Sequence, residues 1–231
     1  MTSTEPNSAD RNSRQRDLVP PEKLASVHAV VIGVGAVGRQ VALQLAALGV
    51  PEMTLYDPDV VGVENLAPQG FWERDLGDLK VRAVAYVALQ QFPGMDLHAV
   101  PRRFRASDVR TWPPDRTVAV FAGVDVIDTR RLIWDATSAR AAFFADGRLA
   151  AEVVRVLASA APHPAGYART LFPASEAYAG SCTAKATIYA ASAAAGLMLA
   201  QFARWLRGQP VTADQTLNLL AAELTVSGPA S

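Results

Sequence analysis

Three glycines at a fixed spacing constrain the fold of this chain more than any other feature. Gly33, Gly35 and Gly38 form a Gly-x-Gly-x-x-Gly loop between an apolar, β-branched run at 28–32 and a helical pattern at 39–49. In this context the first glycine permits a tight turn, the second permits close approach of the backbone to a phosphate, and the third permits close packing of helix and strand. The amino end of the helix adds free N–H groups and the positive end of its dipole. The loop therefore predicts a nucleotide-binding site.

Asp57 follows the glycine loop at the distance expected of a ribose ligand. It ends a second strand, 52–56, where its carboxylate can accept hydrogen bonds from ribose hydroxyls. The alternative is a glycine turn with an incidental aspartate, but strand, loop, helix, strand and acid all fall in the required order. The motif alone does not separate NAD, FAD, S-adenosylmethionine and ATP.

The alternation of strands and helices predicts an α/β fold, namely a doubly wound, Rossmann-like and mostly parallel sheet with a C-terminal extension. The expected strands are 28–32, 52–56, 96–100, 117–122 and 141–145, and the expected helices are 39–49, 79–92 and 129–138. Less regular sequence follows, with a strand at 150–158, a crossover region at about 161–181, a closing Ala-rich helix at about 183–207 and a returning strand within 215–226. We expect one domain, 18–231, preceded by a polar, flexible N-terminal arm, 1–17.

Charge and composition exclude several classes of function. The 231 residues carry 22 basic and 22 acidic side chains, which gives no indication of a nucleic-acid surface or a membrane surface. The apolar run 186–200 is shorter than the roughly 20 residues that a bilayer span needs. The polar N-terminus lacks the apolar segment of a signal peptide, so we expect a cytoplasmic protein.

Cysteine and histidine usage excludes metal centres built on these residues. Cys182 is the only cysteine, so the chain has neither an intrachain disulfide nor a Cys-based zinc site. His28, His98 and His163 lie far apart in the sequence and have no ligand spacing. This composition fits a reducing compartment.

The polar segment after Asp57 separates the nucleotide classes. It contains Asp57-x-Asp59-x-Val61, then Asn65-Leu66-x-x-Gln69, then Leu76-Gly77-x-x-Lys80. This order resembles the signature of the ThiF/MoeB family, which includes the core of ubiquitin-activating enzymes. Further similar segments are Arg11-x-x-Arg14-Gln15, Asp125-x-x-x-x-Arg130, Gly166–Pro173 with Ser181-Cys182 after it, and a helix that ends in Trp205-Leu-Arg-Gly208. The likeness spans roughly residues 11–226.

The resemblance implies ATP-dependent adenylation of the C-terminal glycine carboxylate of a ubiquitin-like or sulfur-carrier protein with a β-grasp fold. The resulting acyl-adenylate would pass to a thiol or another nucleophile, with a conjugating enzyme as a further partner. Carried over residue by residue, Asp57 binds the ribose, Asn65 and Lys80 bind the phosphates, and Asp125 binds Mg²⁺. Arg14 reaches a phosphate in the partner subunit of a homodimer. Lysine, arginine and a metal ion suit this chemistry because they stabilise charge on phosphoryl oxygens.

Cys182 has two interpretations. It lies near the expected start of the closing helix, where the helix dipole favours a thiolate, and Lys185 is close in sequence. In the functional interpretation it captures the activated acyl group as a thioester or carries sulfur towards it. In the structural one it is a small buried hydrophobic residue, which is the usual environment of a free cysteine.

The chain departs from the family pattern at two places. Pro68 stands where many members have a phosphate-binding arginine, which leaves a catalytically weakened scaffold of the same fold as an alternative function. Arg74 and Arg82 are the candidates to replace that arginine. The two Cys-x-x-Cys zinc pairs of many bacterial members are also absent, so no structural zinc is expected. An NAD-linked oxidoreductase is the second alternative, but the segment between Asn65 and Lys80 fits it poorly.

Several of these residues also have ordinary structural interpretations. Asp125 could cap the helix that begins near Thr129, and Lys80 could be a solvated helix lysine. Arg14 could belong to a disordered basic arm. Three charged residues after the last central strand form either a structural ion pair or part of a channel for the tail of the carrier: Asp146, Arg148 and Glu152.

Overall fold

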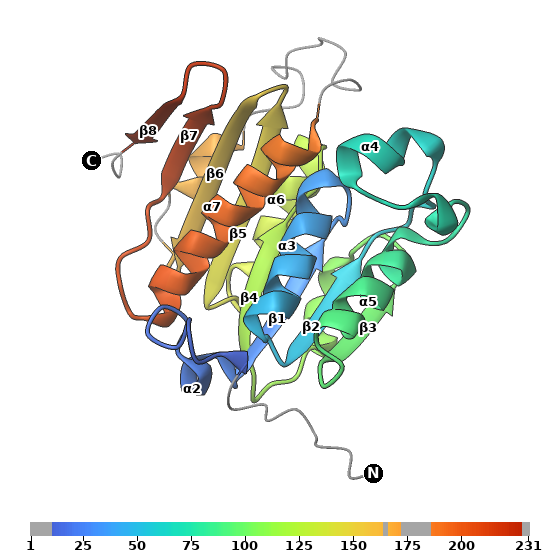
Figure 1. Cartoon of the computed structure of the whole chain (residues 1–231). Helices are drawn as coiled ribbons and strands as arrows, with labels where there is room; N and C mark the ends of the chain where they lie inside the picture. The colour runs from blue at the N-terminus through green and yellow to red at the C-terminus, as the bar shows by residue number, and fades with distance from the viewer. Residues whose placement is uncertain (1–10, 164–165, 172–185, 228–231) are drawn as a thin grey trace.

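The chain folds around one mixed β-sheet (Figure 1). The computed structural model describes residues 11–163, 166–171 and 186–227. The strands in this part are β1 (Val27–Ile32), β2 (Glu52–Tyr56), β3 (Asp96–Val100), β4 (Thr117–Ala122), β5 (Phe143–Ala150), β6 (Val153–Ala160), β7 (Asp214–Asn218) and β8 (Glu223–Ser227). Their order across the sheet is β3-β2-β1-β4-β5-β6-β7-β8. The first five pair in parallel, and β6, β7 and β8 are added antiparallel.

Helices cover both faces of the sheet. The helices on one face are α3 (Ala36–Leu48), α5 (Lys80–Gln91) and α7 (Ile188–Leu206), and α6 (Ile127–Thr137) lies on the other with the 3-10 turn η3 (Ala106–Thr111). The shorter elements are α2 (Pro21–Leu24), η1 (Val63–Asn65), α4 (Leu66–Gln69), η2 (Glu73–Asp75) and η4 (Tyr167–Thr170). In the part of the chain that the structure describes, no helix combines the length and the apolar character that a membrane crossing requires.

Buried strand residues supply a core on each face of the sheet. All six residues of β1 are buried, as expected for a central parallel strand that is covered on both sides. Ala29 and Val31 belong to the core under α3, α5 and α7, whereas Val30 and Ile32 belong to the core under α6. This alternation fixes the register of the sheet, because a slip by one residue would exchange the two faces.

Helix α3 packs directly on the backbone at the ends of β1 and β4. A Cβ atom on Gly38 would lie 1.7 Å from the carbonyl oxygen of Gly33, and a Cβ atom on Gly123 would lie 2.9 Å from the same oxygen. Gly33 itself has a φ of 83°, a conformation that L side chains rarely adopt. The three positions therefore require glycine, and they bring the amino end of α3 against the sheet.

The predicted α/β sheet is confirmed, and the main differences lie in its antiparallel part. The returning strand expected within 215–226 is a hairpin of β7 and β8, and β6 begins later than the expected 150–158 because β5 continues to Ala150. Both hairpins turn through alanines with positive φ, Ala151 and Ala222, each at 55°. Glycine or asparagine usually marks such turns, so the alanines gave no indication of either one.

The closing helix is shorter than the sequence predicts. It was expected at about 183–207 and begins at Ile188, where Thr187 caps it by accepting a hydrogen bond from the N–H of Ala190 at 3.4 Å. Positions 183–185 lie outside the described residues.

The described part of the N-terminal arm, residues 11–17, forms turns at the carboxyl end of α3. Arg11 donates to the carbonyl oxygen of Ala46 at 3.1 Å, and its guanidinium lies 4.8 Å from the centre of the Phe92 ring. Gln15 donates to the carbonyl oxygen of Leu48 at 3.1 Å. Residues 1–10 of the arm lie outside the described residues.

The close packing of α3 makes a stability prediction for Gly38→Ala. The new methyl group collides with the backbone of Gly33, so we expect the free energy of unfolding to fall by about 2 kcal/mol or more. Gly196→Ala is the matched control, because Gly196 is exposed in the middle of α7 and a Cβ there meets nothing within 4 Å. That variant should gain about 0.5–1 kcal/mol from helix propensity. Urea denaturation of both variants measures the two changes, and equal stability of the variants would contradict the packing argument.

Candidate active site

The candidate site lies where the order of the strands reverses. From β1 the chain continues to β2 and β3 on one side, and then returns to place β4 on the other side of β1. The carboxyl ends of these parallel strands meet at one edge of the sheet, and ligands of such sheets bind at this point of reversal. The glycine loop follows β1, Asp57 follows β2, and Asp125 follows β4. The topology therefore brings three of the predicted site segments to one edge (Figure 1).

The glycine loop leaves the amino end of α3 open to a ligand. Gly35 is the N-cap residue of α3, and no side chain caps the first turn. Among the described residues, the three heavy atoms nearest to a Cβ atom on Gly35 would all belong to the side chain of Gln69, the closest at 3.8 Å. The uncapped N–H groups and the helix dipole suit an anion such as a phosphate group.

Asp57 joins the end of β2 to the glycine loop. Its side chain is buried, and the two carboxylate oxygens accept the N–H of Val34 at 2.8 Å and the N–H of Asp59 at 2.9 Å. Burial raises the pKa of Asp57, and the two N–H donors oppose that rise. Each carboxylate oxygen has a second lone pair, so the group can still accept a hydrogen bond from a ribose hydroxyl.

Lys80 is held at the first turn of α5 by Asp59. Its side chain is buried, although the sequence alone allowed a solvated helix lysine, and its Nζ lies 3.0 Å from Oδ2 of Asp59. The backbone N–H of Lys80 also donates to the carbonyl oxygen of Asp59 at 2.9 Å. Gly77 precedes the helix with a φ of 81°, which explains the glycine in the Gly77-x-x-Lys80 spacing.

Asn65 lies in the loop between β2 and α5 and is buried. Its side-chain oxygen accepts the N–H of Gly62 at 2.9 Å. That bond uses the acceptor of the amide, so the amide NH₂ group is the part of Asn65 that can donate to a phosphate.

Asp125 is exposed, and it caps no helix. Helix α6 begins at Ile127 with Val126 as its N-cap and without a side-chain cap, so the capping interpretation of Asp125 is wrong. Within the described residues its carboxylate has no hydrogen bond or ion pair, and no three His, Cys, Asp or Glu residues gather around a metal position. Mg²⁺ bound to a nucleotide often takes one or two protein carboxylates, and Asp125 suits that arrangement.

A buried ion-pair cluster fixes the loop that carries Asp125. Asp146 in the middle of β5 has no exposed surface and pairs with Arg130 and Arg148, the latter at 2.7 Å. Tyr167 donates to the same carboxylate at 3.1 Å, and Arg130 donates to the carbonyl oxygen of Val124. Burial, and after it the charge of Arg148, lowers the pKa of Arg130 to about 10.

The cluster contains the ion pair that the sequence allowed. Asp146 and Arg148 are paired, and the role of these residues in a channel for the tail of the carrier stays a prediction. Glu152 is not part of the pair and accepts a hydrogen bond from the hydroxyl of Tyr189 instead. Sequence spacing could not find the pair of Arg130 with Asp146, because the two residues come from different elements.

Arg14 lies at the opposite edge of the sheet from the other site residues. The turn that contains it packs against the carboxyl end of α3 near Leu48, whereas Lys80 and the glycine loop lie at the carboxyl edge of the strands. Within one chain Arg14 therefore does not join the site. Cys182 lies outside the described residues.

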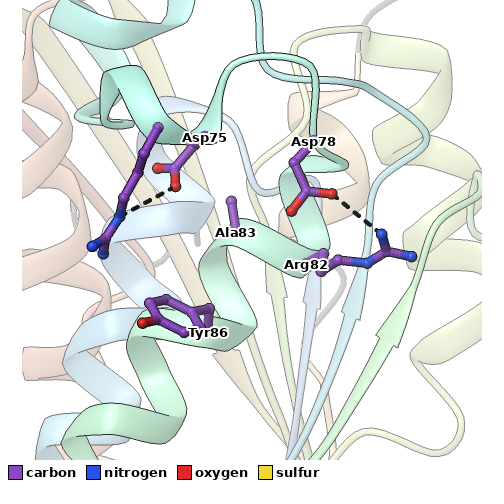
Figure 2. A pocket seen from close by; sticks show the side chains of 6 residues that line it. Asp75, Asp78, Arg82, Ala83 and Tyr86 are labelled. Carbon is purple, nitrogen blue, oxygen red and sulfur yellow. Dashed lines mark hydrogen bonds and ion pairs between the residues drawn. The ribbon is translucent and has the colours of Figure 1, made fainter.

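The two arginines proposed to replace an arginine at position 68 line a surface pocket on the flank of α5 (Figure 2). Arg74 lies 3.9 Å from the centre of the Trp72 ring, and Arg82 pairs with Asp78 at 3.4 Å. Both arginine side chains are more than half exposed. In the described part of the chain, neither guanidinium has a hydrogen bond to the glycine loop or to Asp57.

Sequence reasoning missed Arg39 and treated Gln69 only as part of a motif. Arg39 lies in the first turn of α3 and is 5% exposed. Its Nε atom and Oε1 of Gln69 are buried without a hydrogen-bond partner among the described residues. An arginine in an amphipathic helix pattern is predicted to lie on the surface, so the sequence did not indicate this burial.

A family model and one relative match the sequence of this chain. The model of the ThiF family matches residues 12–226. The SAMP-activating enzyme E1 of Haloferax volcanii is 34% identical over 132 residues, which cover 54% of this chain and 48% of that relative. The match thus spans about half the length of the relative.

Solved structures of low identity share the fold. PaaA superposes with a TM-score of 0.73 at 17% identity, over 99% of this chain and 76% of PaaA. MccB of E. coli with ATP superposes with a TM-score of 0.73 at 16% identity, over 99% of this chain and 73% of MccB. Since the range matched by the family model contains the glycine loop, Asp57, Lys80 and Asp125, the chain belongs to the ThiF family of E1-like adenylating proteins.

Proposed function

We propose that this chain uses ATP and Mg²⁺ to adenylate the C-terminal glycine carboxylate of a ubiquitin-like or sulfur-carrier protein. The observation that carries the proposal is the placement of Lys80 beside Asp59, next to Asp57 and the glycine loop. A dinucleotide needs the loop and the acid but has no evident use for a buried lysine at this position. A triphosphate does, because Lys80 can replace Asp59 with a phosphate oxygen.

The chemistry requires little beyond positioning and charge stabilisation. A carboxylate oxygen of the carrier attacks the α-phosphorus, a new O–P bond forms, and the bond to the bridging oxygen breaks so that pyrophosphate leaves with the electron pair. The attacking carboxylate is already ionised near neutral pH, so the step needs no general base. Lys80 and the amino end of α3 would stabilise the charge that spreads over the phosphoryl oxygens.

The remaining site residues have supporting roles in this proposal. Asp57 would hold the ribose, Asn65 would donate to a phosphate, and Asp125 would hold Mg²⁺, which neutralises phosphate charge when bound. The acyl-adenylate would then pass to a thiol or another nucleophile. That acceptor is Cys182 or a group on a partner such as a conjugating enzyme.

The two alternative functions, an NAD-linked oxidoreductase and a catalytically weakened scaffold, have less support from the candidate site. An NAD-linked oxidoreductase has no evident use for the buried Lys80 and its ion pair with Asp59. A catalytically weakened scaffold is favoured by Pro68, but the retained Asp57, Lys80 and Asp125 argue for a working site.

The nucleotide preference tests the proposal directly. Isothermal titration should show binding of ATP–Mg²⁺ and no comparable binding of NAD, because NAD has no γ-phosphate and carries a nicotinamide riboside beyond its second phosphate. Tight binding of NAD together with no binding of ATP would overturn the proposal.

Lys80→Ala and Asp125→Ala should each abolish carrier-dependent exchange of pyrophosphate into ATP. Loss of one charge partner of the transition state costs about 3 kcal/mol, a hundredfold or more in rate. Asp128→Ala is the matched control, because Asp128 is also exposed, three residues after Asp125. Circular dichroism checks that the fold is intact. Full activity of Asp125→Ala would show that another group holds the metal ion.

The position of Arg14 predicts a site that is completed by a second subunit. If Arg14 acts across a symmetric homodimer, mixing Arg14→Ala with Lys80→Ala should restore up to about a quarter of the activity, because random pairing leaves half of the dimers mixed, each with one intact site. The exchange assay on mixtures after subunit exchange measures this. A lack of rescue, when mass spectrometry shows mixed dimers, would exclude a role for Arg14 in the partner's site.

A further inference from the structure

We propose that Arg39 binds a phosphate group of the nucleotide. The assignment deepens the proposed function and depends on it, because it places a residue of α3 in the same nucleotide site. It rests on the burial of Arg39, on its missing partner and on its position beside the glycine loop.

Arg39 is a buried cation without a counter-charge in the described chain. It is 5% exposed, Nε has no hydrogen-bond partner, and no carboxylate lies within ion-pair distance of the guanidinium. Asp75 is the carboxylate that acts on Arg39 electrostatically, but it accepts the N–H of Trp72 at 2.9 Å and lies 3.9 Å from Nε of Arg74. Burial lowers the pKa of Arg39, which shows the cost of holding this charge away from water.

Arg39 lies one helical turn from the open glycine position. Its backbone N–H donates to the carbonyl oxygen of Gly35 at 3.0 Å, and Nη1 lies 3.1 Å from the Cβ position of Gly70. Gly70 follows Gln69, whose side chain lies 3.8 Å from the Cβ position of Gly35. Arg39 and Gln69 therefore lie side by side between α3 and α4, next to the loop where a phosphate is expected.

A second buried polar group without a partner, in the side chain of Gln69, supports the same ligand. Oε1 of Gln69 is buried without a hydrogen-bond partner among the described residues. The oxygen and nitrogen of a glutamine amide exchange places when the amide rotates by 180°, and their assignment follows from the partners. After that rotation Gln69 and Arg39 both present donors, and one anion would satisfy the two groups.

A purely structural role explains less of the geometry. The guanidinium carbon lies 5.1 Å from the centre of the Phe71 ring, which is a cation–π contact. The N–H groups of a guanidinium point along the edges of its plane, so the contact with Phe71 supplies no acceptor for the buried Nε–H. A phosphate accepts from these edges in the bidentate manner typical of arginine.

The assignment also explains how the chain tolerates Pro68. The resemblance places a phosphate-binding arginine at that position of α4, and Arg39 would deliver a guanidinium from the facing helix α3 instead. Arg74 and Arg82, the candidates suggested by sequence, are paired or stacked on the flank of α5.

The test uses Arg39→Met, which retains packing on Phe71 and removes the charge, with Arg39→Lys as the conservative variant. Isothermal titration with ATP–Mg²⁺ and with adenosine separates phosphate contacts from base and ribose contacts. We expect Arg39→Met to bind ATP about tenfold or more weakly, as for a lost charged hydrogen bond, and to bind adenosine like the wild type. Arg39→Lys should lie between the two. Arg82→Met, an exposed arginine of α5, is the matched control and should bind ATP like the wild type.

Thermal unfolding without nucleotide distinguishes a ligand-binding role from a structural one. Removal of an unpaired buried cation should leave the melting temperature of Arg39→Met unchanged or raised, while ATP no longer raises it to the wild-type extent. A lower melting temperature with unchanged ATP affinity, or an equal loss of ATP and adenosine binding, would overturn the assignment while the nucleotide site stands. A wild-type protein that binds no ATP would overturn the proposed function and this assignment together.

Discussion

The contact between the backbone of α3 and the ends of β1 and β4 is the constraint on which the rest of the site depends. Gly33, Gly38 and Gly123 meet there without side chains, and a Cβ on Gly123 would lie 2.9 Å from both the oxygen of Gly33 and the nitrogen of Gly38. This approach places the amino end of α3 at the reversal of strand order. Any side chain in the contact would lift the helix and remove its N–H groups from the place where a phosphate can meet them.

Polar contacts then fix the end of each strand around that helix. Asp57 binds the N–H of Val34 and so connects β2 to the glycine loop. On the other side, Arg130 connects Asp146 of β5 to the carbonyl oxygen of Val124 in the loop after β4. Buried groups of this kind are costly unless each has its partners, and here the partners are backbone groups of the loops themselves. These contacts therefore position the loops, and they are separate from the packing of the apolar core.

Sequence spacing predicts those parts of the candidate site that lie within short local motifs. The glycine loop, Asp57 and Lys80 are recognisable because a strand, a turn and a helix start impose their residue types within short stretches. The burial of Arg39 was not predictable, since it depends on α4 folding over α3, and the pair of Arg130 with Asp146 depends on two elements meeting in space. The β7–β8 hairpin was missed for a local reason, because Ala222 occupies a turn position where glycine is usual.

The two cations of the candidate site, Lys80 and Arg39, differ in how easily a phosphate can bind them. Lys80 is buried, but its partner Asp59 has a side chain that is 60% exposed. A phosphate that takes Lys80 releases Asp59 into water, where a carboxylate is well solvated, so the exchange has a small cost. No carboxylate of the described residues pairs with Arg39, so a phosphate that reaches it would gain the interaction without displacing such a partner. The chain would thus offer an incoming triphosphate two cations. Lys80 is held in place by an exchangeable acid, whereas Arg39 has a buried Nε–H that finds no acceptor among the described residues and that a phosphate would satisfy.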